Sequence, residues 1–201
     1  MLVNTKFFGE VDVNENKIVT ITNGLLGFEN LTKYVLIPHD KDNMFKWFQS
    51  VEDVSVCFLV VEPVTFMLNY SLEISDEVVE RLSIKVAEDV ITYALVVIPD
   101  DPLKISANLC GPLVINMVNR LGMQVVSMNP HHQVKHFIIE ELKANTTKLM
   151  QNVSMTFGQP APPATEPSAK ADDEKKNEFS IFESAVTENS FDFAALNTLM
   201  G

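Results

Sequence analysis

The side chains best suited to catalysis or metal binding are few in this sequence and are widely spaced. His131, His132 and His136 form the one local histidine cluster. No cysteine and no convincing carboxylate accompanies them at the spacing of a zinc site. We interpret the cluster as part of a solvent-exposed turn around Asn129-Pro130. The sequence therefore predicts no metal site and no cofactor.

The two cysteines, Cys57 and Cys110, each lie in an apolar run. Their number allows a disulfide, but two buried thiols in a reducing cytosol are favoured. A nucleophilic cysteine needs a histidine and a partly exposed, electropositive setting, which neither run suggests. Paired acids such as Asp100-Asp101 and Glu140-Glu141 are explained as turns or solvated surface. We predict no catalytic residue; the alternative is a small-ligand-binding or hydrolytic barrel that uses Cys110 and the histidine cluster.

Composition places further limits on function. The chain has 201 residues, is 46% hydrophobic and carries a net charge of −12. This charge argues against direct nucleic-acid binding, which requires clustered Lys and Arg. It suits attraction of a basic protein partner, or simply solubility. No apolar run reaches the roughly 18 residues of a membrane span, and the N-terminus lacks a signal-peptide pattern, so we expect a cytoplasmic protein without membrane contact.

The first 150 residues read mainly as strands between turn signals. This pattern predicts a mainly β fold, a small antiparallel barrel-like domain with one or two short helices. One helix begins after Ser75 and runs to Leu82, because Ser75 can cap it. A second short helix is expected between Asn116 and Gly122, and 138–150 has a weaker helical pattern. The candidate strands are Leu2–Phe8, Lys17–Ile21, Tyr34–Pro38, Phe45–Ser50, Val54–Val61, Val90–Ile98, Leu103–Ser106, Leu113–Asn116, Met123–Met128 and Val134–Ile138.

The domain is expected to span residues 1–157, because composition changes sharply after Phe157. Residues 158–177 contain four prolines and no aliphatic residue larger than alanine, which predicts a disordered linker. Residues 178–201 have apolar side chains at alternating spacings of three and four, which is the pattern of one face of an amphipathic helix. We expect such a segment to dock on its own body or a neighbouring one. The alternative is a disordered tail with incidental hydrophobic residues. The residues predicted to dock are Phe179, Phe182, Val186, Phe193, Leu196 and Met200; Asn189 interrupts their face.

Three blocks of the body resemble bacterial flagellar assembly factors of the FliW family. They read "NGLLGFE" (23–29), "FQSVEDVSVCFLVVEPVTFMLNY" (48–70) and "ANLCGPLVINMVNRLGMQVV" (107–126). The family pattern has G-x-x-G-F-E, then L-Q-S-x-E-D and D-P-x-x-F-x-x-x-Y, then A-N-L-x-x-P-x-x-I-N and G-x-Q-V. Phe48 and Glu62 depart from it conservatively. The resemblance covers roughly residues 1–145, with Gly24 and Gly27 as turn positions.

The resemblance implies a β-barrel-like protein that is not an enzyme. Family members bind the C-terminal region of flagellin and the translational regulator CsrA, and thereby relieve repression of flagellin translation. An alternative role for Asn108 and Asn116 is to hold irregular backbone in place by hydrogen bonds. We also expect Gly111-Pro112 to turn the chain. A further hypothesis is that the tail imitates a client helix and competes with it. The residues predicted to contact partners are Gln49, Ser50, Glu52, Asp53, Glu62, Asn108 and Asn116.

Overall fold

A computed structural model describes residues 1–39 and 44–157, with side chains through residue 148. The chain divides into two compact units, Met1–Leu149 and Met150–Gly201. We call the first unit the body. The predicted linker (158–177) and tail (178–201) lie outside the described residues, so both remain predictions.

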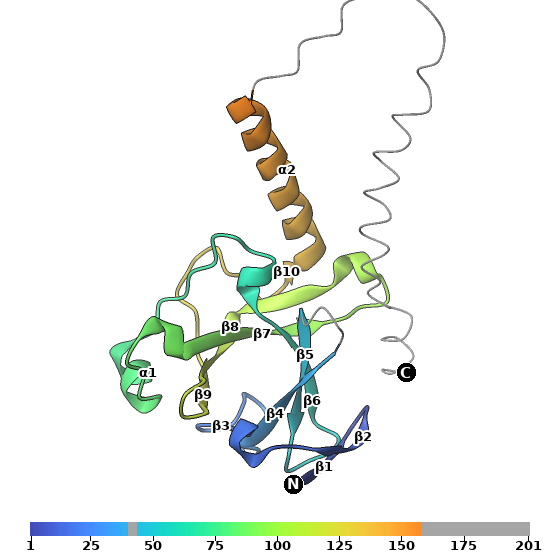
Figure 1. Cartoon of the computed structure of the whole chain (residues 1–201), viewed down its shortest axis with the longest axis vertical. Coiled ribbons are helices and arrows are strands. Elements are labelled where there is room, and N and C mark those ends of the chain that lie inside the picture. Colours follow the sequence, from blue (N-terminus) through green and yellow to red (C-terminus); the bar gives the residue numbers. More distant parts are fainter. Residues whose placement is uncertain (40–43, 158–201) are drawn as a thin grey trace, which may run out of the picture. The chain divides into compact units, whose positions relative to one another are not determined.

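Seven strands of the body close into a barrel (Figure 1). Neighbours follow the order β8-β7-β6-β5-β4-β3-β9, and β9 pairs back onto β8. Every pair is antiparallel except β3–β9, which is parallel and was not expected. The mainly β, barrel-like prediction is confirmed. The strands are β3 (Val19–Ile21), β4 (Lys33–Pro38), β5 (Phe45–Ser50), β6 (Cys57–Val61), β7 (Val90–Val97), β8 (Ser106–Asn116) and β9 (Leu121–Gln124).

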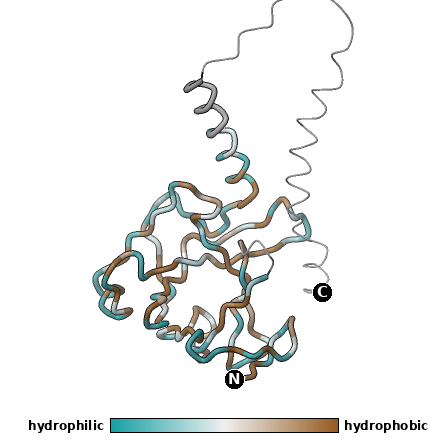
Figure 2. The backbone as a smooth tube through the Cα atoms, viewed as in Figure 1, coloured by the Kyte–Doolittle hydropathy of each residue, from teal (hydrophilic) through white to brown (hydrophobic). Residues whose placement is uncertain are grey.

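Alternate side chains of these strands point inward and form the core, as the two-residue period of a strand requires. Tyr34 and Phe48 stack there with ring centroids 4.5 Å apart. Figure 2 shows the apolar backbone stretches running through the strands of the body. The remaining members of this cluster are Val19, Ile21, Leu25, Val60, Tyr93, Leu113 and Ile115.

Shorter elements pack outside the barrel. A hairpin of β1 (Leu2–Thr5) and β2 (Gly9–Asp12) leaves Val3 buried against β4, and β10 (His136–Phe137) pairs with the start of β8. The sequence reading did not predict β2. The described residues contain four 3-10 helices: η1 (Glu15–Lys17), η2 (Pro63–Thr65), η3 (Ala87–Asp89) and η4 (Pro102–Lys104). The strand expected at Leu103–Ser106 is therefore wrong: Pro102 begins a helical turn, and β8 starts only at Ser106.

Helix α1 (Asp76–Arg81) confirms the first predicted helix, since the Ser75 hydroxyl accepts from the Val78 N–H at 3.4 Å. The weak helical pattern at 138–150 corresponds to helix α2 (Ile138–Phe157), the longest helix among the described residues. Its Asn145 side chain is 8% exposed and donates to the Phe66 carbonyl at 2.6 Å. Within the described residues, neither helix is long and apolar enough to cross a membrane.

The second predicted helix, between Asn116 and Gly122, is wrong. The segment is a tight turn between β8 and β9 in which Arg120 has a φ of 62°. The Asn116 amide oxygen accepts from the N–H groups of Val118 (2.9 Å) and Asn119 (3.4 Å). A short amide side chain that captures nearby backbone donors competes with helix formation.

The expected turn at Gly111-Pro112 is also wrong, because β8 continues through it as a bulge. Tyr93 pairs with Leu113 and Leu95 pairs with Asn108, so residues 109–112 lie opposite Ala94 alone. By contrast, Gly24 and Gly27 are confirmed as turn positions, with φ of 67° and 83°. A side chain at Gly24 would lie 2.6 Å from the Glu29 Cα, so only glycine fits there.

Candidate partner-binding surface

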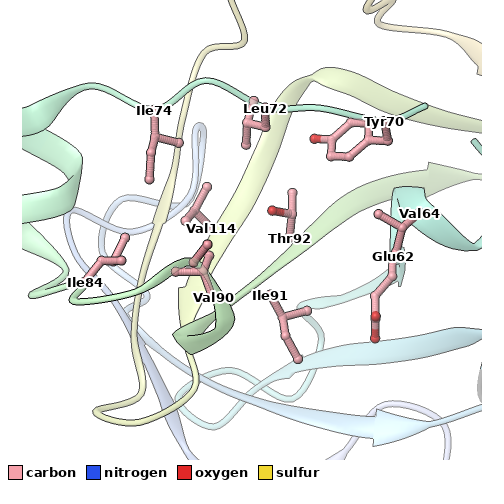
Figure 3. Close-up of a pocket in the computed structure, with 11 residues that line it drawn as sticks. Glu62, Val64, Tyr70, Leu72, Ile74, Ile84, Val90, Ile91, Thr92 and Val114 are labelled. Carbon is pink, nitrogen blue, oxygen red and sulfur yellow. The ribbon is translucent and has the colours of Figure 1, made fainter. Parts of the chain in front are cut away.

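A mainly apolar groove of about 530 Å³ lies on the outside of the barrel (Figure 3). One wall comes from the excursion between β6 and β7 that carries α1, and the other side comes from β7 and β8. We call it the groove. Its apolar lining consists of Val64, Leu72, Ile74, Ile84, Ala87, Val90, Ile91 and Val114. Three polar residues, Glu62, Tyr70 and Thr92, also line it.

Residues 71–89, which carry α1, are buried against the barrel at one position and are half-buried or exposed elsewhere. Leu82, at the end of α1, is fully buried against Val114 and Val125. Leu72, Ile74 and Ile84 pack against the same cluster but remain half-buried. Burying such side chains fully would stabilise each by about 1.5–3 kcal/mol. The body alone leaves part of that gain unused.

The carboxylate of Glu62 is occupied by an ion pair. Lys46 Nζ donates to Glu62 Oε1 at 2.6 Å and to the Tyr93 hydroxyl at 3.0 Å, and Tyr93 donates to Glu62 at 3.1 Å. Burial opposes the charge on Lys46, yet its bonds to Glu62 and Tyr93 outweigh that effect and raise its pKa. Glu62 therefore contributes little free negative charge to the groove.

Tyr70 presents a different situation. Its hydroxyl is buried and has no hydrogen-bond partner among the described residues, and burial raises its pKa to about 12. Its ring stacks on His132 with centroids 5.0 Å apart. An unpaired buried hydroxyl costs about 1–3 kcal/mol of stability.

The solvent-exposed interpretation of the histidine cluster is wrong for His132, which is 6% exposed. Ser127 Oγ lies 2.6 Å from its Nδ1, and burial, followed by the nearby His136 and His131, lowers its pKa. His136 lies 3.2 Å from Glu141. The chain folds back along β8 here, which local spacing alone does not reveal. Among the described residues, no three His, Cys, Asp or Glu side chains form a group suited to a metal ion.

Neither cysteine lies in a nucleophile's environment. The Cys110 thiol donates to the His132 backbone carbonyl at 3.2 Å. Burial raises the pKa of Cys57 to about 12. Both cysteines are free thiols, as predicted, but they are half-buried rather than buried. No observation here supports the hydrolytic alternative.

Four of the predicted contact residues come together where β5 ends and the chain turns toward β6. We call this segment, residues 49–56, the β5–β6 loop, and the hydrogen bonds of the four side chains hold the loop itself. Gln49 is 1% exposed: its Oε1 accepts from the Lys6 N–H at 2.9 Å, and its Nε2 donates to backbone carbonyls, the shortest bond being 3.0 Å to Ser50. The buried Ser50 hydroxyl accepts from the N–H groups of Glu52 (3.1 Å) and Asp53 (3.0 Å).

The two acids of this loop reach the surface but are also hydrogen-bonded. Glu52 accepts from the N–H groups of Thr32 (2.6 Å) and Lys33 (2.9 Å), and the bond from Lys33 is the main cause of its lowered pKa. Asp53 accepts from the Ser55 hydroxyl at 2.7 Å, which lowers its pKa. Both carboxylates are therefore fixed in place and negatively charged.

The two asparagines lie away from this loop and from each other. Asn108 accepts from the N–H groups of Cys110 (3.0 Å) and Gly111 (3.2 Å), which holds the bulge. Asn116 is 1% exposed, and it also donates to the Leu82 carbonyl at 2.9 Å. The structure thus brings four of the seven predicted residues together and leaves Glu62, Asn108 and Asn116 apart.

Sequence reasoning missed the apolar side of the groove. Leu72, Ile74 and Ile84 lie outside the three motif blocks. The available signal was the number of large apolar residues in a segment that otherwise reads as a polar connection around one short helix.

Comparisons with known proteins agree with this fold. The family model described as FliW protein matches residues 2–138. The flagellar assembly factor FliW of Alkaliphilus metalliredigens is 38% identical over 144 residues, which cover 71% of this chain and 89% of that protein. The corresponding protein of Clostridium botulinum is 37% identical over 141 residues, 70% of this chain and 100% of its own length.

A solved structure leads to the same conclusion. The crystal structure of the flagellar assembly factor FliW is similar with a TM-score of 0.64 and 30% identity, covering 69% of this chain and 96% of that chain. The matches account for the barrel and its surface excursions. The chain belongs to the FliW family of flagellar assembly factors.

Proposed function

We propose that this flagellar assembly factor acts in the cytoplasm as a partner-switching binding protein for flagellin and CsrA, and not as an enzyme. The observation that carries the proposal is the FliW match over residues 2–138, which includes the walls of the groove. In this scheme, release of flagellin frees the protein to capture CsrA, which relieves repression of flagellin translation.

The groove is the surface best suited to flagellin. A groove with apolar walls accepts the apolar face of an amphipathic helix, with anchors at spacings of three and four residues. We therefore assign the C-terminal region of flagellin to it. Val64, 59% exposed on the rim, is available for contact without any change in the body.

CsrA contacts RNA through basic surface, and an acidic antagonist complements it electrostatically. Glu52 and Asp53 are the acids that we propose for this contact, because both are negatively charged and held by the loop. Gln49, Ser50, Glu62, Asn108 and Asn116 support the proposal by fixing the backbone or the groove around them.

Co-purification tests the proposal as a whole. The full chain, mixed with flagellin and separately with CsrA at micromolar concentration, is expected to retain each partner. Loss of either complex contradicts the proposed function.

Charge reversal tests the CsrA surface. Glu52→Lys with Asp53→Lys should slow CsrA association, and the difference should shrink as salt rises, since exposed charges are screened over about 8 Å at physiological ionic strength. Unchanged association kinetics would remove these two acids from the interface.

A further inference from the structure

A tight turn after β3 holds a leucine almost fully out of the body. Leu25 is buried, and its carbonyl accepts from the Phe28 N–H at 2.7 Å, which closes a turn over residues 25–28. Gly27 has a φ of 83°, which suits the third position of a type II turn, and Leu26 therefore occupies the second position. The Leu26 side chain is 85% exposed, more than any other large apolar side chain that the structure describes.

Hydrogen bonds to a distant part of the chain fix this turn. Gln124 Oε1 accepts from the Leu26 N–H at 3.0 Å, and Gln124 Nε2 donates to the Gly111 carbonyl at 3.1 Å. Glu29 Oε1 accepts from the Gly27 N–H at 2.9 Å. The backbone of Leu26 is thus joined to the bulge of β8 through one side chain. Because the turn is already held in place, it loses little conformational entropy when a partner covers it.

Two further apolar side chains are exposed on segments that contact this turn. Phe28 is 37% exposed, and its ring meets the Phe58 ring edge-on with centroids 5.2 Å apart. Val126 is 79% exposed and follows Gln124 by two residues in an extended segment, so the two side chains share a face. We call Leu26, Phe28 and Val126 the apolar patch. Single exposed apolar residues are ordinary, but a fixed group of three is typical of a contact surface.

Acidic side chains border the apolar patch. Glu29 is exposed, and its bond from the Gly27 N–H lowers its pKa. Glu52 accepts from the Thr32 N–H at 2.6 Å, which joins the β5–β6 loop to the end of the same segment. A partner that covers the patch therefore meets carboxylates at its edge. This arrangement suits a basic protein surface that also offers apolar contacts.

We propose that the apolar patch anchors CsrA, with Leu26 entering an apolar depression of that protein and the neighbouring acids, Glu29 and Glu52, meeting basic side chains around it. This inference rests on the proposed function, since it takes CsrA as the partner. Charges at the rim of an interface mainly speed association, whereas an apolar side chain buried at its centre mainly slows dissociation. None of the three patch residues lines the groove, so the surface for CsrA and the surface for flagellin are separate.

Binding kinetics of the full chain on immobilised CsrA, measured by surface plasmon resonance, test the anchor. Leu26→Ser should dissociate about tenfold faster than the parent or more, with an association rate within about twofold. Leu26→Met keeps an apolar side chain of similar size, so its dissociation rate should stay within about threefold of the parent. The matched control is Leu103→Ser, at a leucine of η4 that is 60% exposed, and it should leave both rates unchanged. Thermal unfolding followed by circular dichroism checks that every variant is folded.

The outcomes separate the anchor from the proposed function. If the parent chain does not bind CsrA, both are contradicted. If the parent binds and Leu26→Ser dissociates at the parent's rate, the anchor is overturned and the proposed function stands. An equal acceleration in Leu103→Ser also overturns the anchor, because the effect then belongs to no particular surface. A change in association rate alone, which disappears at high salt, assigns the contact to the acids and likewise contradicts the anchor.

Discussion

The β5–β6 loop and the groove differ in how far their polar groups are hydrogen-bonded and their apolar side chains are buried. In the loop, Gln49 and Ser50 are buried, and their side chains bond to the backbone around them. In the groove, half-buried aliphatic residues line a cavity, and the Tyr70 hydroxyl has no partner among the described residues.

The difference shows how family motifs and binding surfaces diverge. A buried polar group must be paired, so polar residues in the matched blocks are needed first for the fold. Surface that remains unsatisfied in the isolated body is where a partner gains most free energy. We therefore expect substitutions of the buried Gln49 and Ser50 to act mainly on stability, and substitutions in the groove to act mainly on flagellin binding.

Asn116→Ala should have the largest effect on stability. It removes bonds to the Leu82 carbonyl and to the N–H groups of Val118 and Asn119, and leaves those groups without this partner. We expect a loss of about 2–4 kcal/mol in the free energy of unfolding, measured by urea denaturation. Asn30→Ala, at an exposed position, should change it by no more than about 0.5 kcal/mol. A similar small change in both variants would contradict the scaffold role of Asn116.

Gln49→Ala should lower the free energy of unfolding somewhat less, by about 2 kcal/mol. It removes the partner of the Lys6 N–H and of several carbonyls, and these groups can form other hydrogen bonds near the surface. CsrA and flagellin affinities should stay unchanged once corrected for the folded fraction. The comparison between loop and groove fails if this variant keeps its stability and loses a partner.

Glu52 should give the smallest effect, visible as a pH dependence. Its folded pKa lies below the ordinary value of 4.5, mainly through the bond from the Lys33 N–H. Its contribution to stability is therefore complete above about pH 4.5 and is lost as the pH falls through the lower folded pKa. The free energy of unfolding, measured between about pH 6 and pH 3, should fall less steeply with decreasing pH for Glu52→Gln than for the parent. Parallel curves would show that the Thr32 and Lys33 contacts add no stability.

The sequence predicts the barrel well where local patterns suffice. The predicted strand Phe45–Ser50 has the same bounds as β5, and Ser75 caps α1 as expected. The parallel β3–β9 pair and the bulge at residues 109–112 arise from long-range closure of the barrel, which no local spacing encodes.

The site could be predicted only in part, for the same reason. The β5–β6 loop is contiguous, so its four residues were found together. His132 reads as an exposed turn residue until the chain is folded back onto Tyr70. The groove joins Leu72, Ile84 and Val114 from separate segments, and nothing in their spacing reveals that they share a surface.

A matched pair of substitutions tests the central claim that the groove, and not the motif loop, binds flagellin. Val64→Asp and Val54→Asp each place a carboxylate at an exposed valine, 59% and 48% exposed, in the groove and in the loop respectively. Calorimetric titration with the C-terminal region of flagellin should show at least tenfold weaker binding for Val64→Asp, about 1.4 kcal/mol, and a change within about twofold for Val54→Asp. Unchanged affinity of Val64→Asp, with weakened binding of Val54→Asp, would contradict the account.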